Sequence, residues 1–87
     1  MKIVLHREFK KSFKRLSERH QTKTLEVIRR FSSSPHDPIL KNHALTGRMQ
    51  GLRSISVTGD CRIIFEELDG YVLVFLLDVG SHENVYC

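Results

Sequence analysis

Two histidines beside glycine-containing segments are the side chains best suited to acid–base chemistry in this sequence. His43 lies shortly before Gly47, and His82 follows Gly80, which is expected to end the apolar strand of residues 71–77. The unperturbed pKa of histidine lies close to neutral pH, so one imidazole can accept a proton while another donates one. Such a pair is a minimal set for cleaving RNA, in which a base takes the proton of a 2′-hydroxyl and an acid protonates the departing 5′-oxygen.

Three further side chains could assist this chemistry. Arg62, expected on a strand, could stabilise the negative charge of a phosphorane-like transition state. Asp60 could orient a histidine, and Tyr86 could stack on a base or donate a hydrogen bond. Each also has an ordinary structural role: Asp60 as a turn residue, Arg62 as a solvent-facing strand residue and Tyr86 at the edge of the core. Periodicity alone favours these ordinary roles.

The sequence predicts no metal ion and no cofactor. His6, His20 and His36 have no partner at metal-ligand spacing, and neither an HExxH motif nor a Cys-His pair occurs. Cys61 and Cys87 form no disulfide framework, so we expect two reduced thiols in a cytoplasmic protein. No apolar run is long enough to span a bilayer, and the N-terminus carries charges too early for a signal peptide.

The charge of the chain suits a polyanionic partner. The formal net charge is +4 and the sequence pI is near 9.4, a balance that is typical of proteins that bind nucleic acid or an acidic protein. Nine of the 14 Lys and Arg residues lie between residues 7 and 30, whereas residues 60–83 are acidic by comparison. The basic surface should therefore lie on the N-terminal half.

The N-terminal half reads as a strand followed by two helices. Residues 3–5 predict a strand, and Phe9, Phe13 and Leu16 recur at helical spacing within residues 7–19. A second helix is expected to begin near Thr22 as its N-cap. Its apolar face would consist of Leu25, Val27, Ile28 and Phe31. Two helices joined so closely should form an antiparallel hairpin on one surface.

The C-terminal half alternates with a period of two, which predicts strands. Segments 52–57, 61–66 and 71–79 follow one another, with residues 71–79 expected to be the most buried. Asp69-Gly70 predicts a tight primed hairpin turn between the last two. No confident element is predicted for residues 42–47. The 87 residues therefore predict one α+β domain of two layers, a strand and a helical hairpin packed on an antiparallel β-meander.

Three ordered segments resemble the YafQ branch of the RelE/ParE toxin superfamily. They are residues 41–47 (KNHALTG), 51–53 (GLR) and 79–86 (VGSHENVY). Each segment alone is a weak signal, but the ordered set at these separations is specific. Together with the basic helical N-terminus and the meander, the resemblance covers almost the whole chain and implies the RelE-like fold.

The resemblance implies a toxin of a type II toxin–antitoxin pair. Family members enter the ribosomal A site and cut mRNA without metal, leaving a cyclic phosphate. The resemblance assigns catalytic roles to His43, Asp60, His82 and Tyr86, and transition-state stabilisation to Arg62.

The resemblance also implies the partners of such a toxin. Basic side chains would contact RNA with salt-sensitive, sequence-independent affinity. Those expected at this interface are Lys10, Lys11, Lys14, Arg15 and Arg53. A small, acidic, partly disordered antitoxin would fold over the basic surface, and operator DNA would be contacted only through that antitoxin.

One position departs from the family pattern. Ser56 stands where the family commonly has a histidine, four residues before Asp60. Serine is no base near neutral pH without help, which argues for a homologue with impaired catalysis. Two alternatives stay open beside the endoribonuclease. One is a ParE-like inhibitor of DNA gyrase without chemistry of its own, and the other is a catalytically impaired homologue that acts as an antitoxin-bound co-repressor.

Overall fold

The computed structural model describes residues 1–81, which form two α-helices, two 3-10 helices and five strands. In chain order they are β1 (Lys2–Leu5), α1 (Arg7–Arg15), α2 (Glu18–Ser33), η1 (Pro38–Leu40), β2 (His43–Ala44), η2 (Gly47–Met49), β3 (Arg53–Ser56), β4 (Cys61–Leu68) and β5 (Leu73–Ser81). Within the part of the chain that is described, no helix combines the length and apolar character that a membrane crossing requires.

The strands form one mixed sheet in the order β1-β5-β4-β3-β2. The predicted antiparallel meander is β3, β4 and β5. β1 runs parallel to β5, with Ile3 opposite Val74, and the two-residue β2 pairs with β3 at the other edge, where no element was predicted. The predicted two-layer α+β architecture is confirmed, and the sheet gains two edge strands whose pairing the sequence pattern did not indicate.

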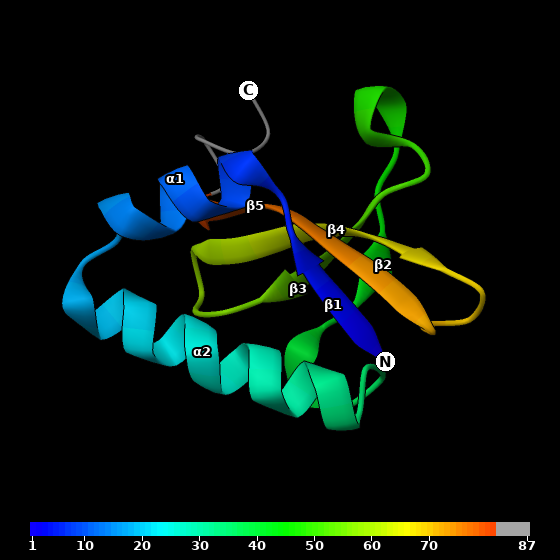
Figure 1. Cartoon of the computed structure of the whole chain (residues 1–87), viewed down its shortest axis with the longest axis horizontal. Helices are drawn as coiled ribbons and strands as arrows, with labels where there is room; N and C mark the ends of the chain where they lie inside the picture. Colours follow the sequence, from blue (N-terminus) through cyan, green and yellow to red (C-terminus); the bar gives the residue numbers. More distant parts are fainter. Residues whose placement is uncertain (82–87) are drawn as a thin grey trace.

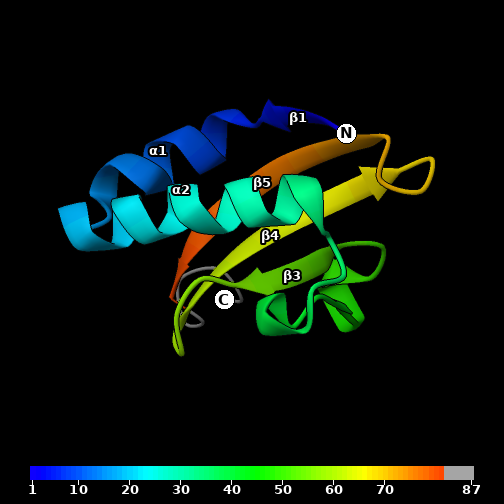
Figure 2. The same ribbon diagram turned by 90° about the horizontal axis from the view of Figure 1, so that it is seen from below.

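Both helices cover the same face of the sheet and run in roughly opposite directions (Figure 1, Figure 2). Phe9 of α1 and Phe31 of α2 are buried in one apolar cluster with Ile63, Phe65 and other strand residues. The rings of Phe31 and Phe65 meet edge to face with centroids 4.8 Å apart, an arrangement that aromatic pairs prefer. The core therefore fills the layer between helices and sheet, and the other face of the sheet carries different side chains.

A β-bulge in β5 keeps its apolar side chains on the helix side. Phe65 of β4 pairs with Leu76, and the next pair along uses Asp78, so Leu77 is an extra residue. A bulge of this kind shifts the alternation of a strand by one residue. Leu76 and Val79 both face the core as a result, and both are buried. β5 is thus no more continuously buried than β4, contrary to the expectation for residues 71–79.

The break between the helices lies at Leu16 and Ser17, so the predicted boundary at Thr22 was wrong. Leu16 has an extended backbone with φ −69° and ψ 151°. Ser17 is the N-cap of α2, and its hydroxyl oxygen accepts a hydrogen bond from the backbone N–H of His20. Leu16 still packs against the core from its extended position, and its spacing from Phe13 therefore imitates a longer helix.

The buried face of α2 is Thr24, Val27 and Phe31, and the placement of Leu25 on that face was wrong. Leu25 is 55% exposed. Thr24 can take a core position because its hydroxyl donates to the His20 carbonyl oxygen at 2.7 Å, which satisfies its polar group inside the helix. A sequence pattern that counts threonine as polar therefore assigns Leu25 to the buried face in place of Thr24.

The hairpin between β4 and β5 and the end of β5 differ from the predictions. Asp69 and Gly70 have the positive φ angles of a primed turn, but Tyr71 does too, with φ 69°. Leu68 pairs with Leu73, so the connection is four residues long instead of two. At the other end β5 does not break at Gly80, because Gly80 and the next residue remain paired with β4.

Candidate functional site

Several predicted site residues share the face of the sheet that is turned away from the helices. Ile55 and Ile63 point into the core, so their strand neighbours point to the opposite side. Ser56 is opposite Arg62, and His43 of β2 is opposite Ser54. We call this side the distal face and define it by His43, Ser54, Ser56, Arg62 and Gly80.

The strand register gives the distance between His43 and Arg62 on the distal face. His43 and Ile64 lie in one row across β2, β3 and β4, and Arg62 is two residues further along β4. With strands about 4.8 Å apart and a rise of about 3.3 Å per residue, the Cα atoms of His43 and Arg62 are roughly 12 Å apart. An imidazole and a guanidinium on long side chains can both reach one phosphodiester across that span.

Two polar atoms on this face are buried and have no hydrogen-bond partner among residues 1–81. They are the Nη1 atom of Arg62 and the hydroxyl oxygen of Ser54. On β5 the residue opposite Arg62 is Gly80, which places no side chain beside the guanidinium. An unpaired buried polar group costs about 1–3 kcal/mol, so both donors are suited to a ligand that would complete them.

His43 is exposed at the sheet edge and its ring is held by the backbone. Its Nδ1 atom lies 2.8 Å from the carbonyl oxygen of Lys41. A carbonyl oxygen only accepts, so the neutral imidazole that makes this bond carries its proton on Nδ1 and leaves the lone pair on Nε2. The arrangement depends on Lys41, which adopts a left-handed backbone with φ 51°. His43 therefore presents Nε2 as a proton acceptor.

Ser56 takes part in the turn between β3 and β4. Its hydroxyl donates to the carbonyl oxygen of Thr58 at 2.8 Å, and the Thr58 hydroxyl accepts from the backbone N–H of Cys61 at 3.1 Å. These bonds satisfy the hydroxyl of Ser56 within the turn. At this position the chain offers a structural hydroxyl and no titratable base.

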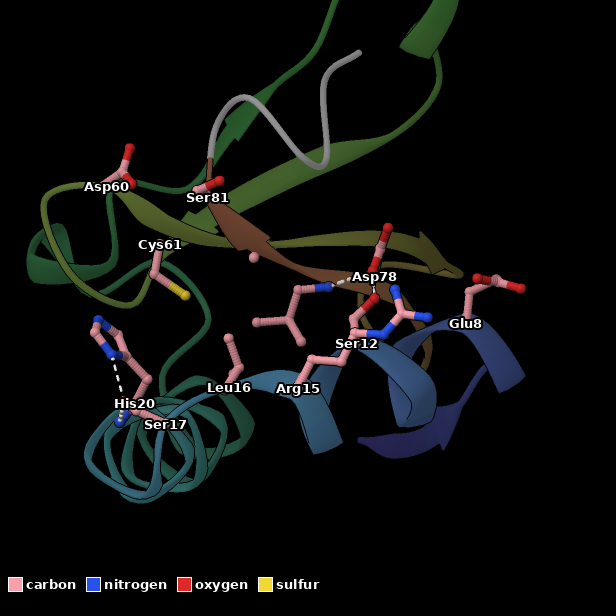
Figure 3. Close-up of a pocket in the computed structure, with 12 residues that line it drawn as sticks. Glu8, Ser12, Arg15, Leu16, Ser17, His20, Asp60, Cys61, Asp78 and Ser81 are labelled. Atoms are coloured by element: carbon pink, nitrogen blue, oxygen red, sulfur yellow. Dashed lines mark hydrogen bonds between the residues drawn. The ribbon is translucent and has the colours of Figure 1, made fainter.

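Asp60 is exposed in the same turn, at the rim of an open hollow of about 730 Å³. Figure 3 shows Asp60 and Cys61 near Ser81 at the end of β5, and Cys61 and His20 both line the hollow. Burial raises the pKa of the Cys61 thiol, and the Asp60 carboxylate raises it further, while a hydrogen bond from the Gly80 backbone opposes both. The thiol is therefore kept protonated and unreactive near neutral pH.

The hollow mixes acidic and basic groups from α1, α2 and β5. Glu8 and Asp78 face Arg15 and His20 around it (Figure 3). The Ser12 hydroxyl donates to Asp78, so part of this charge is already bound. Within residues 1–81, His, Cys, Asp and Glu side chains form no group that could hold a metal ion.

The basic side chains predicted to contact RNA occupy two places. Lys10, Lys11, Lys14 and Arg15 are exposed on α1, on the helix side of the sheet. Arg53 is half-buried in β3, and its Nε atom donates to the Asn42 side-chain oxygen at 2.9 Å. The structure thus separates the basic helix from the distal face.

His82 and Tyr86 lie outside the described residues.

Asn42 and Tyr71 are two residues near the site that the sequence analysis did not single out. Asn42 links Arg53, the Pro35 carbonyl oxygen and the Tyr71 hydroxyl through its side-chain amide. The position of Asn42 directly before His43 could have indicated its structural role, because neighbouring residues of an extended segment point to opposite faces.

A family model describing the bacterial toxin of the type II toxin–antitoxin system, YafQ, matches residues 1–86. The chain belongs to the YafQ family. It is thus a YafQ-like toxin of the type II toxin–antitoxin class. A search of curated protein sequences found no match.

Solved structures of YafQ-like toxins share the fold. YafQ from E. coli strain BL21(DE3) matches with a TM-score of 0.83 and 21% identity, over 98% of this chain and 97% of that one. The toxin in the E. coli DinJ–YafQ toxin–antitoxin complex matches with a TM-score of 0.77 and 22% identity, over 98% and 96%. A YoeB/ParE toxin from Agrobacterium tumefaciens has a TM-score of 0.77 and 21% identity, over 94% and 99%.

Proposed function

We propose that this YafQ-family protein is a ribosome-dependent endoribonuclease that cuts mRNA without a metal ion. In this proposal His43 and His82 are the acid–base pair, and Arg62 stabilises the charge that develops on the phosphate. Asp60 and Tyr86 would assist by orienting a histidine and by contacting a base. The products would be a cyclic phosphate and a free 5′-hydroxyl.

The observation that carries this proposal is the buried Nη1 atom of Arg62, which has no hydrogen-bond partner among residues 1–81 and lies on the same sheet face as His43. A guanidinium with a free donor suits a phosphate oxygen, because charged hydrogen bonds to phosphate are among the strongest available to a protein. The residue opposite Arg62 on β5 is Gly80, which adds no side chain of its own beside the guanidinium. His43 adds a proton acceptor at the edge of the same face.

An acidic antitoxin is the proposed protein partner. The E. coli relative has been solved in complex with DinJ, and the exposed lysines of α1 give this chain a basic surface that suits an acidic segment. A partner that binds only the folded toxin would also raise its stability by mass action. Contact with operator DNA would come through this antitoxin.

A reconstituted translation system tests the nuclease. Purified toxin is added to a defined mRNA with and without ribosomes, and cleavage sites and terminal phosphates are mapped. We expect cleavage only with ribosomes, and its loss in His43→Ala and Arg62→Gln. His6→Ser is the matched control: it removes a histidine that caps α1, and serine preserves the cap.

Two results would overturn this proposal. Intact mRNA together with inhibited DNA gyrase would favour the gyrase-directed alternative. Intact mRNA with intact gyrase, from a protein that still binds its antitoxin, would favour the co-repressor, in line with the hydroxyl at position 56.

A further inference from the structure

We infer that Asn42 is a positioning residue that holds His43 in the tautomer with its proton on Nδ1. The inference deepens the proposed function, and it rests on that function only where it concerns RNA cleavage. The tautomer itself is a property of the folded protein, and it can be measured without substrate.

The side-chain amide of Asn42 connects three separate parts of the fold. Its nitrogen donates to the Pro35 carbonyl oxygen and to the Tyr71 hydroxyl, each at 2.9 Å. Its oxygen accepts from the Nε atom of Arg53, also at 2.9 Å. The loop after α2, the β4–β5 hairpin and strand β3 thus meet at one amide. Three bonds at a half-buried site fix the position of residue 42 more firmly than β2 can, since β2 is only two residues long.

We call the Asn42 amide and its three hydrogen-bond partners, Pro35, Arg53 and Tyr71, the clamp. Two of these partners are held in place by further contacts. The Tyr71 backbone N–H donates to the Glu67 carboxylate at 2.8 Å. Its ring packs edge to face against Phe31, with centroids 6.0 Å apart, and lies 6.2 Å from Phe65. Arg53 is held in the pairing of β3 with β4. Movement of Asn42 would therefore have to disturb the core.

The clamp acts on His43 through Lys41, the residue that precedes Asn42. Asn42 lies between Lys41, whose carbonyl oxygen meets Nδ1 of His43 at 2.8 Å, and His43 itself. Lys41 has a left-handed backbone with φ 51°, a conformation that costs a non-glycine residue about 1 kcal/mol or more. Without restraint at residue 42, the segment would relax and the carbonyl would turn away from the ring. The bond at Nδ1 is exposed, so it has little strength of its own to resist.

The consequence for catalysis is an assignment of roles. With the proton on Nδ1, Nε2 of His43 can take the proton of the 2′-hydroxyl as its oxygen bonds to phosphorus. The bond from phosphorus to the 5′-oxygen then breaks, and that oxygen takes a proton from the acid, which leaves this role to His82. His43 is the base under this assignment, and Asn42 supports it without touching RNA.

Nitrogen-15 NMR of the imidazole rings tests the tautomer directly. Wild-type protein with a neutral His43 ring should show a protonated Nδ1 and an unprotonated Nε2. In Asn42→Ala the Nε2-protonated form should become a major population. Gln21→Ala is the matched control, because Gln21 is a half-buried amide that bridges the Phe13 and Leu16 carbonyl oxygens at 3.0 and 3.3 Å, remote in sequence from β2. An unchanged His43 tautomer in folded Asn42→Ala would overturn the inference.

Milder variants keep the test decisive if alanine prevents folding. Tyr71→Phe removes one hydrogen bond of the clamp and preserves the ring, so it should give a smaller shift in the same direction. Asn42→Asp keeps an acceptor for Arg53 and for the Tyr71 hydroxyl, but it loses the donor to the Pro35 carbonyl oxygen and sets a carboxylate oxygen against it, so it should shift the tautomer in the same direction. Wild-type tautomer populations in both the Tyr71→Phe and the Asn42→Asp proteins would refute the clamp.

Cleavage kinetics separate this inference from the nuclease proposal. Asn42→Ala should lower kcat about tenfold with little change in KM, because only the proton acceptor is misplaced. If wild-type protein cleaves no RNA and Asn42→Ala still shifts the tautomer, the positioning role stands and the nuclease fails. If wild-type protein cleaves and Asn42→Ala changes neither kcat nor tautomer, the positioning role fails and the nuclease stands.

Discussion

Replacing Ser54 by alanine should stabilise the protein, although the residue is fully buried in the sheet. The Ser54 hydroxyl oxygen has no hydrogen-bond partner within residues 1–81. Burying an unpaired hydroxyl costs about 1–3 kcal/mol, and its removal recovers this free energy apart from a small loss of packing. We expect a net increase of about 1 kcal/mol in the free energy of unfolding.

Ser56→Ala provides the comparison within the same strand. Ser56 is the same residue type on the same face, but its hydroxyl donates to the Thr58 carbonyl oxygen at 2.8 Å. Its removal should therefore destabilise the protein by about 0.5–1.5 kcal/mol. Two serines two positions apart are thus expected to shift stability in opposite directions.

Urea unfolding followed by circular dichroism measures both changes. For a domain of this size, 1 kcal/mol corresponds to a shift of about 4–8 °C in Tm, and the urea midpoint should move without a change in slope. A Ser54→Ala protein that is less stable than wild type would refute the reasoning, because it would mean that the hydroxyl is satisfied. A stability gain together with slower mRNA cleavage would indicate that the donor serves a ligand.

Three further predictions concern the distal face and the neighbouring turn. Arg62→Gln should lower the cleavage rate about 10²- to 10³-fold in the translation assay, since a donor to the transition state is lost; a rate within twofold of wild type would remove Arg62 from the mechanism. Ser56→His should raise that rate if a base is missing at this position, and no gain would mean that the site works with other groups. Burial raises the pKa of Cys61 above its ordinary value of 9.0. The stability that follows from this raised pKa is fully present below pH 9.0 and is lost as pH rises through the folded-state pKa. The urea midpoint of wild type should accordingly fall more steeply at alkaline pH than that of Cys61→Ala, and parallel curves would contradict this.

The sequence predicted the layers and the meander because both depend on local periodicity. The pairing of β1 with β5 joins residues 2–5 to residues 73–76, and no local pattern carries such a contact. The helix boundary was misplaced because Leu16 keeps helical spacing while it packs from an extended backbone. Thr24 was missed as a core residue because an internal hydrogen bond makes its hydroxyl compatible with burial.

The candidate site was less accessible to sequence reasoning than the fold. Residue types and the family resemblance single out His43, Asp60 and Arg62, but only the register shows that His43 and Arg62 share one face. The turn places Asp60 at the rim of a hollow on the side of the helix junction instead. The clamp at Asn42 is built from residues 35, 53 and 71, and their convergence depends on the tertiary fold.

The parallel pairing of β1 with β5 also determines when the sheet of this toxin can be completed during synthesis of the chain. β5 lies between β1 and β4, so an inner strand of the sheet is made last. A nascent chain can form α1, α2 and the β3–β4 hairpin, but β1 must wait as an unpaired strand until β5 has left the ribosome. Contacts of such long sequence separation form slowly. The distal face, which needs Gly80 beside Arg62, is therefore absent from every shorter intermediate and is completed only after most of the chain has emerged.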